Sequence, residues 1–209
     1  AFWNNFNTGG SPSTNWRTDA TGGVDTLALP GSTTDVFFQT TTPTAANLAT
    51  TLGQALSIKT LNFTADATSP VSISGNSLTL TPASSATGLS INAAAGAVTI
   101  NSDVVLGAAQ TWTNDSSSAL TVNGEVSGVA SLTKAGNGTV VLNGANTYVG
   151  NTTLSAGTLV AGNFQALGLA ANTLTLNGGI LDLASNASTT AKNTTVGGNV
   201  TINSNLATP

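Results

Sequence analysis

The stretch 138-GTVVLNGANTYVGNTTLSAGTLVAG-162 contains no charged residue and is built almost entirely of Gly, Thr, Asn, Ala, Val and Leu. Its aliphatic residues come in short runs that alternate with Thr or Ser and end at Gly or Asn. This pattern is typical of brief strands joined by tight turns. The stretch carries no acid, no base and no strong metal ligand. We therefore expect it to build a scaffold, with Val and Leu pointing inward and Thr forming ladders outside.

The whole chain shares this composition. Its 209 residues are 40% hydrophobic and only 6% charged, with a formal net charge of −4 and no Cys, His or Met. A chain of this length and hydrophobic content can bury a core, and its low charge argues against disorder. The four cations are scattered singly along the chain. Nucleic acid is therefore not expected as a partner, because neutralising phosphates needs clustered Lys and Arg.

Short alternating segments recur from residue 57 onward, and strong helix formers are scarce. The steps from Leu78 to Val98 and on to Leu120, Val140 and Leu159 are nearly constant. A period of about 20 residues predicts an all-β fold, a parallel β-helix or β-solenoid of stacked coils. About eight coils spaced about 4.8 Å apart would form a rod of about 38 Å. A β-sandwich is the structural alternative, although its strands would recur at shorter intervals without a common period.

The sequence divides into two parts. We interpret residues 46–209 as one continuous β-helix and residues 1–45 as an aromatic-rich N-terminal cap or the first irregular coils. Two of the three Trp, four of the six Phe and the only Arg lie in residues 1–45. Aromatic side chains there would cover the open end of the core. A carbohydrate-binding platform built on Trp3 and Trp16 is the alternative.

The residues from Ser131 to Asn163, SLTKAGNGTVVLNGANTYVGNTTLSAGTLVAGN, closely resemble the passenger-associated repeat of bacterial autotransporters. The matching positions, in chain order, are Leu132, Lys134, Gly136, Gly138, Thr139, Val140, Leu142, Gly144, Asn146, Tyr148, Gly150, Thr152, Leu154, Gly157 and Leu159. The resemblance implies a right-handed parallel β-helix, secreted or at the cell surface of a Gram-negative bacterium. It implies an adhesive, structural or display role and no catalysis, because the repeat is scaffold.

No constellation in the sequence points to catalysis, a cofactor or a metal. Without His or Cys, the common hydrolytic triads and the usual zinc ligands are missing. The eight acidic residues do not recur with the coil period, so they would not gather on one face as a glycosidase or a calcium site requires. Lys134 lies within the repeat, where a structural role is expected. We predict no enzyme activity, no catalytic residue, no cofactor and no metal site.

The two ends of the predicted rod differ, and this difference carries the functional prediction. Residues 199-NVTINSNLATP-209 form no cap and read as a strand that stops while still alternating. We predict an extracellular rod that associates with its own copies, head to tail or laterally, into surface filaments or matrix. The residues expected at these contacts are Phe2, Trp3, Phe6, Trp16, Val200, Ile202 and Leu206. The alternative is a monomeric passenger that acts as an adhesin or display stalk and binds glycans or host surfaces.

Overall fold

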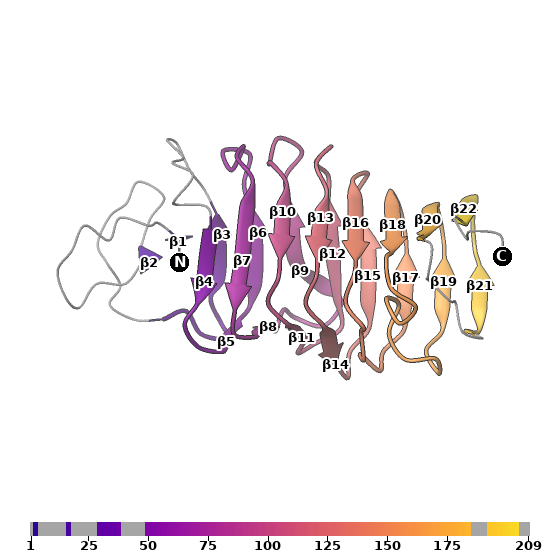
Figure 1. Cartoon of the computed structure of the whole chain (residues 1–209), viewed down its shortest axis with the longest axis horizontal. Helices are drawn as coiled ribbons and strands as arrows, with labels where there is room; N and C mark the ends of the chain where they lie inside the picture. Colours follow the sequence, from indigo (N-terminus) through magenta and orange to yellow (C-terminus); the bar gives the residue numbers. More distant parts are fainter. Residues whose placement is uncertain (1, 4–15, 18–28, 39–48, 185–191, 205–209) are drawn as a thin grey trace.

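A computed structural model of the chain describes residues 2–3, 16–17, 29–38, 49–184 and 192–204. Every regular element in these ranges is a β-strand. These ranges contain no helix that could span a membrane. The chain winds in coils stacked along one axis, so that parallel strands lie side by side down the length of the molecule (Figure 1). The predicted β-solenoid is thus confirmed.

Three sheets run along the stack, and each is named here by a letter. Sheet A has the order β2 (Trp16–Arg17), β1 (Phe2–Trp3), β3 (Asp35–Phe38), β6 (Thr60–Phe63), β9 (Ala86–Ile91), β12 (Gln110–Asn114), β15 (Leu132–Ala135), β17 (Thr152–Leu154), β19 (Leu174–Leu176) and β21 (Thr194–Val196). Sheet B has the order β22 (Val200–Ser204), β20 (Gly179–Leu183), β18 (Thr158–Ala161), β16 (Thr139–Leu142), β13 (Leu120–Val122), β10 (Val98–Ile100), β7 (Val71–Gly75) and β4 (Ala49–Leu52). Sheet C is shorter, with β14 (Val126–Gly128), β11 (Val104–Leu106), β8 (Leu78–Leu80) and β5 (Leu56–Ile58). Only the pairing of β1 with β2 is antiparallel among the described strands.

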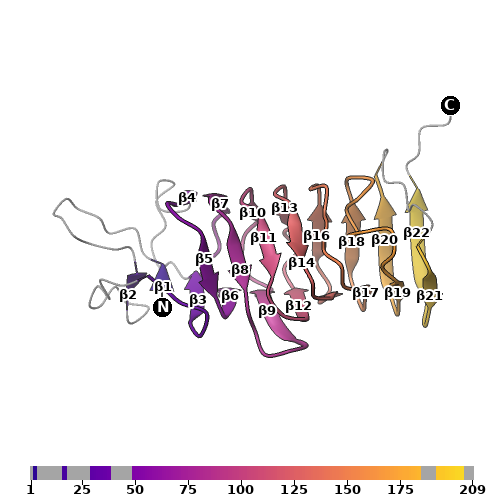
Figure 2. The same ribbon diagram turned by 90° about the horizontal axis from the view of Figure 1, so that it is seen from below.

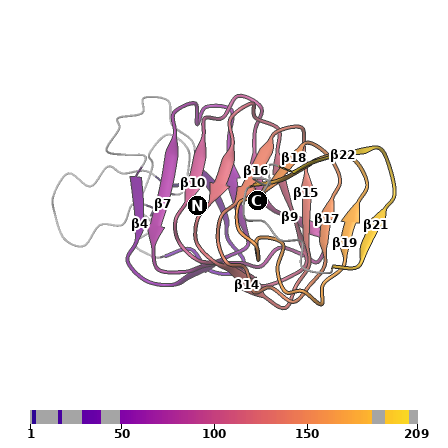
Figure 3. The same ribbon diagram turned by 45° about the vertical axis from the view of Figure 1, so that its right-hand side comes forward.

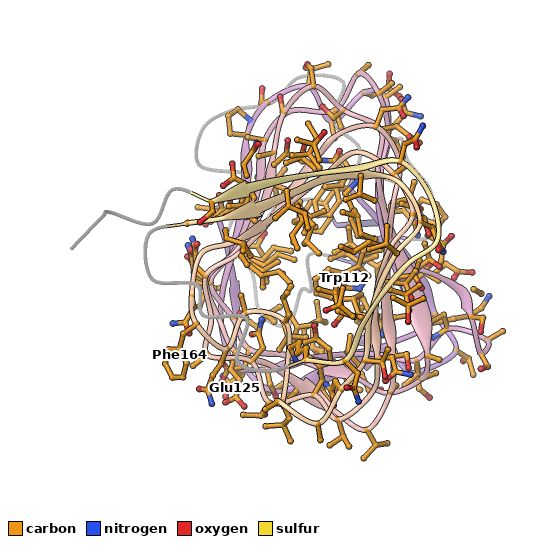
Figure 4. All side chains as sticks on the ribbon, turned by 90° about the vertical axis from the view of Figure 1, so that its right-hand side faces the viewer. Trp112, Glu125 and Phe164 are labelled. Carbon is orange, nitrogen blue, oxygen red and sulfur yellow. The ribbon has the colours of Figure 1, made fainter. Side chains whose placement is uncertain are left out.

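The core fills the inside of the coils. Strands such as β10 and β13 bury both aliphatic ends and leave the central Thr half-exposed, as the alternation predicts. Figure 4, seen along the stack, shows Trp112 inside the coil and Glu125 and Phe164 at the outside. Burying one such aliphatic side chain stabilises the fold by about 1.5–3 kcal/mol before the entropy loss, whereas an exposed ion pair contributes at most about 1 kcal/mol. A chain this poor in charge can therefore be stable.

The pairing of the coils confirms most of the predicted period and corrects one step. Val98 pairs with Leu120, Leu120 with Val140 and Val140 with Leu159, so the three later predicted steps each join one coil to the next. The predicted step from Leu78 to Val98 is wrong, because the two residues lie in different sheets. Leu78 pairs with Val104 in sheet C, and the sheet-B strand before Val98 begins at Val71. The early coils are therefore longer than the later ones.

One β-bulge lies within sheet A. The register between β9 and β12 skips Gly88, so β9 carries one extra residue. The side chain of Gln110 occupies the space beside this glycine, since a Cβ on Gly88 would lie 1.8 Å from Gln110 Oε1. That same oxygen accepts a hydrogen bond from Trp112 Nε1 at 3.2 Å. The bulge therefore makes room for a buried amide that orients the Trp112 ring.

The predicted boundary near residue 45 lies outside the described residues. Before it, β3 pairs with β6, and Val36 and Phe38 are buried in the common core. The Phe38 ring stacks on Phe63 with centroids 4.9 Å apart. The strand from Asp35 to Phe38 therefore packs on the coil stack itself.

Candidate functional site

The described part of the chain offers little that could perform acid–base or metal chemistry. No three His, Cys, Asp or Glu side chains in it lie close enough together to hold a metal ion. An ion pair joins Lys59 Nζ to Asp35 at 3.0 Å on the surface. The Thr60 hydroxyl and Lys59 hold the pKa of Asp35 below its usual value despite partial burial. The features that distinguish this chain lie instead in the coil from Leu132 to Ala161.

The face of the stack that sheet C forms has no strand in this coil. Sheet C ends at β14, and the next coil places residues 144–150 there without a strand. Backbone hydrogen bonds to the preceding coil still form, from the Thr147 amide to the Val126 carbonyl and from the Val149 amide to the Gly128 carbonyl, both at 2.9 Å. The side chain of Asn146 adds two more. Its Oδ1 accepts from the Val126 amide at 2.7 Å, and its Nδ2 donates to the Ala166 carbonyl at 2.6 Å. One buried amide therefore joins the coil before it to the coil after it and pairs a backbone group in each.

Tyr148 is buried two residues further along. Its hydroxyl lies 2.6 Å from Thr152 Oγ1, which in turn donates to the Leu167 carbonyl at 3.2 Å. The Asn172 amide donates to the Tyr148 carbonyl at 2.7 Å. Burial raises the pKa of Tyr148, so its hydroxyl stays neutral and acts as a hydrogen-bond donor. Tyr148 thus links this face of the stack to sheet A.

Lys134 is also buried, at an inward position of β15 between Trp112 and Leu154 of the neighbouring coils. Its Nζ donates to three carbonyls, those of Ala135 at 2.8 Å, Gly136 at 2.7 Å and Ala156 at 2.9 Å. Burial lowers the pKa of Lys134 to about 8, and the charge of Asp115 partly opposes this shift. All three ammonium hydrogens are engaged, so this lysine is a clamp between two coils. The structural role predicted for it agrees with this geometry.

The pattern of short runs that end at glycine predicts tight turns at Gly144, Gly150 and Gly157, but these three glycines have different roles. Gly157 has a φ of 69°, which a residue with a side chain rarely adopts, so the turn explains this position. Gly144 and Gly150 do not have left-handed φ angles. A Cβ on them would lie 2.3 Å from the Gly124 carbonyl oxygen and 2.2 Å from that of Ala130. Close stacking of consecutive coils, and not turn geometry, requires glycine at these two positions.

Residues 132–161, which include Lys134, Asn146 and Tyr148, match the family model described as the passenger-associated-transport-repeat. The chain contains a passenger-associated transport repeat. This finding confirms the resemblance seen in residues 131–163. Lys134, Asn146 and Tyr148 therefore all lie within the matched repeat.

One relative is the Adhesin BmaC autotransporter of Brucella suis biovar 1 (strain 1330), which is 33% identical over 145 residues. The alignment covers 52% of this chain and 4% of the relative. The chain thus spans only a small part of the length of the curated relative that it matches. No solved structure matches the chain. Together with the repeat and the fold, this similarity makes the chain an autotransporter-passenger-like β-helix.

The structure describes only some of the predicted self-association residues. Phe6 and Leu206 lie outside the described residues. Phe2, Trp3 and Trp16 belong to β1 and β2, of which only the backbone pairing is described. Val200 and Ile202 lie in β22 at the opposite end (Figure 2). Their role in association stays a prediction.

In the last described coil, two apolar side chains that would point into the core are exposed. Val196 continues the column of Leu176, and Ile202 continues that of Leu181. Leu176 and Leu181 are buried, whereas Val196 is 61% and Ile202 54% exposed. Figure 3 shows β21 and β22 as the last strands at this end of the stack, and they belong to different sheets. The described stack therefore ends with apolar side chains and strand edges that lack a further described coil.

Proposed function

We propose that the chain is a non-enzymatic coil stack of a secreted or cell-surface adhesin of a Gram-negative bacterium. The observation that carries this proposal is the passenger-associated transport repeat, placed in a stack whose inside is filled with apolar side chains. The adhesin relative supports it. The stack would supply both the rigid length and the surface that touches the target.

The outer surface of sheet A is suited to such contacts. One column of outward positions holds threonine in six successive coils, at residues 87, 111, 133, 153, 175 and 195. Directly after three neighbouring strands of sheet B, Asn143 donates to Asn123 and Asn123 to Asn101, each at 2.8 Å. Neutral hydroxyl and amide groups of this kind exchange hydrogen bonds with the hydroxyls of a glycan coat without a large desolvation cost.

The test is retention of coated beads on cultured mammalian cells under flow. Beads carrying the folded chain should be retained, and beads carrying the same chain after irreversible heat unfolding should be washed away at the rate of albumin-coated beads. Equal retention of folded, unfolded and albumin-coated beads would overturn the adhesive function.

Self-association is the second candidate function, favoured by the exposed Val196 and Ile202. Stacking this coil on the first coil of another copy would bury both side chains and pair the strand edges, and such a head-to-tail contact repeats into filaments. In sedimentation equilibrium, the native chain should gain mass with concentration and Ile202→Asp should remain monomeric. Val129→Asp is the matched control, because Val129 is 84% exposed at a site that stacking leaves uncovered. A native chain that stays monomeric at high concentration would exclude end-to-end stacking.

A further inference from the structure

Four Asn-Gly pairs occur in the sequence, and they begin at Asn123, Asn137, Asn143 and Asn177. Asparagine is thermolabile, because its side-chain amide can be lost when the backbone nitrogen of the next residue attacks it. Glycine offers this nitrogen with the least hindrance, since it has no Cβ and adopts the widest range of φ and ψ angles. The structure decides which of the four pairs is free to react.

Two of these pairs have the same local sequence, Leu-Asn-Gly, at residues 142–144 and 176–178. Asn143 directly follows β16 and Asn177 directly follows β19, and both asparagines are exposed. Their neighbours in the sequence therefore predict equal reactivity. Any difference between them must come from the contacts that the coil stack provides.

Three of the pairs have a reacting group held by a hydrogen bond. Asn143 and Asn123 each donate their side-chain nitrogen, the atom that would leave, to the next asparagine of the ladder at 2.8 Å. In the pair that begins at Asn137, the attacking nitrogen is engaged instead, because the Gly138 amide donates to the Asn114 carbonyl at 2.7 Å. Each of these pairs must break a hydrogen bond before it can react.

The pair formed by Asn177 and Gly178 lacks this protection. Within the described ranges, neither the Asn177 side-chain nitrogen nor the Gly178 backbone nitrogen donates a hydrogen bond. The surroundings of Gly178 are also more open. A Cβ placed on it would lie 3.0 Å from the Ser155 carbonyl oxygen, with the next atom 4.0 Å away, whereas a Cβ on Gly144 would lie 2.3 Å from the Gly124 carbonyl oxygen. Gly178 therefore has room to turn its nitrogen toward the Asn177 side chain.

We propose that Asn177 is a site of spontaneous deamidation. The Gly178 backbone nitrogen loses its proton to hydroxide and forms a bond to Asn177 Cγ. The bond from Cγ to Nδ2 breaks, and Nδ2 leaves as ammonia. Water then opens the resulting cyclic imide at either carbonyl carbon, which leaves aspartate or isoaspartate. The net reaction consumes one water and releases one ammonia, and it does not depend on the adhesive role proposed above.

The modification would act on the last described coil. Asn177 and Gly178 lie in the link from β19 to β20, and these strands pair with β21 and β22 (Figure 1). A Cβ on Gly198 would lie 2.1 Å from the Asn177 carbonyl oxygen, so the next coil packs closely on this link. Isoaspartate routes the main chain through Cγ and lengthens the link by one atom. The coil that contains β21 and β22 should therefore loosen as the protein ages.

The test is peptide mass spectrometry of the full chain after incubation in mildly alkaline buffer, once folded and once in urea. In the folded chain, Asn177 should deamidate at least about tenfold faster than Asn143, since only Asn143 must break a hydrogen bond. In urea, the two should deamidate at similar rates, because their local sequence is the same. No deamidation of Asn177 in the folded chain, or a rate no faster than that of Asn143, would overturn the proposal.

Gly178→Ala tests the attacking nitrogen, because a Cβ hinders its approach. The variant needs no left-handed φ and should fold, and it should slow the deamidation of Asn177 at least about tenfold. Gly53→Ala is the matched control, since a Cβ there meets nothing within 4 Å, and it should leave the rate unchanged. Unchanged deamidation in Gly178→Ala would overturn the assigned chemistry.

Hydrogen–deuterium exchange measures the effect on the last described coil. In the native chain, residues 194–204 should exchange faster after ageing than before, and in aged Gly178→Ala they should exchange as in the fresh chain. Unchanged exchange in an aged native chain that carries the modification would overturn the loosening of this coil.

Discussion

Removing the ammonium of Lys134 should destabilise the chain although its hydrogen bonds all go to neutral carbonyls. Lys134→Met keeps most of the aliphatic stem, which packs between Trp112 and Leu154. It removes the donor to three carbonyls at 2.7 to 2.9 Å. An unpaired buried polar group costs about 1–3 kcal/mol. At the lower bound for each carbonyl, the free energy of unfolding should fall by about 3 kcal/mol.

Urea unfolding followed by far-UV circular dichroism measures this change as a lower midpoint at an unchanged slope. Lys59→Met is the matched control. Lys59 makes a surface ion pair with Asp35, with both side chains about two-fifths exposed, so its loss should cost less than about 1 kcal/mol. If Lys134→Met proves as stable as the native chain, the cost of burying the ammonium matches what its three hydrogen bonds contribute, and the clamp interpretation fails.

Three further changes follow from the same geometry. The pKa of Lys134 is lowered to about 8 from 10.5, so the unfolded chain binds more protons than the folded chain between these pH values. The urea midpoint of the native chain should therefore rise with pH across that window, and this rise should be missing in Lys134→Met. Asn146→Leu leaves two buried backbone groups without partners and should cost about 3 kcal/mol in urea unfolding, whereas Asn143→Leu on the exposed ladder should cost far less. Gly157→Ala combines a φ of 69° with a Cβ 2.3 Å from a carbonyl oxygen and should lower the melting temperature by about 5 °C or more, while Gly53→Ala, which has nothing within 4 Å, should leave it nearly unchanged.

The alternation of apolar and polar residues predicted which side chains enter the core, because a strand has a period of two. That rule also places Lys134 inside, since it lies two residues after the buried Leu132. Composition argues the other way, as lysine is almost never fully buried. The carbonyls that make its burial possible come from the end of its own strand, from the turn after it and from the next coil, and no local pattern reveals them.

The period of about 20 residues was a less accurate guide to the structure than the alternation of apolar and polar residues. It holds where coils are short, from Val98 to Leu159, and fails before Val98, where turns lengthen and a bulge adds Gly88. Two strands of different sheets can happen to lie one coil length apart in the sequence, as those at Leu78 and Val98 do, and spacing alone does not separate them.

Double electron–electron resonance on paired spin labels tests most directly that each coil adds one strand to the same column. The chain has no cysteine, so two introduced cysteines carry the labels without competition. Ala49, Thr99 and Asn203 lie in one outward column of sheet B, with seven pairing steps from the first to the last and five from the second. At about 4.8 Å per step, the labels at 49 and 203 should be about 10 Å farther apart than those at 99 and 203, each with a narrow distribution. Equal mean distances, or broad distributions for both pairs, would contradict the stacked solenoid.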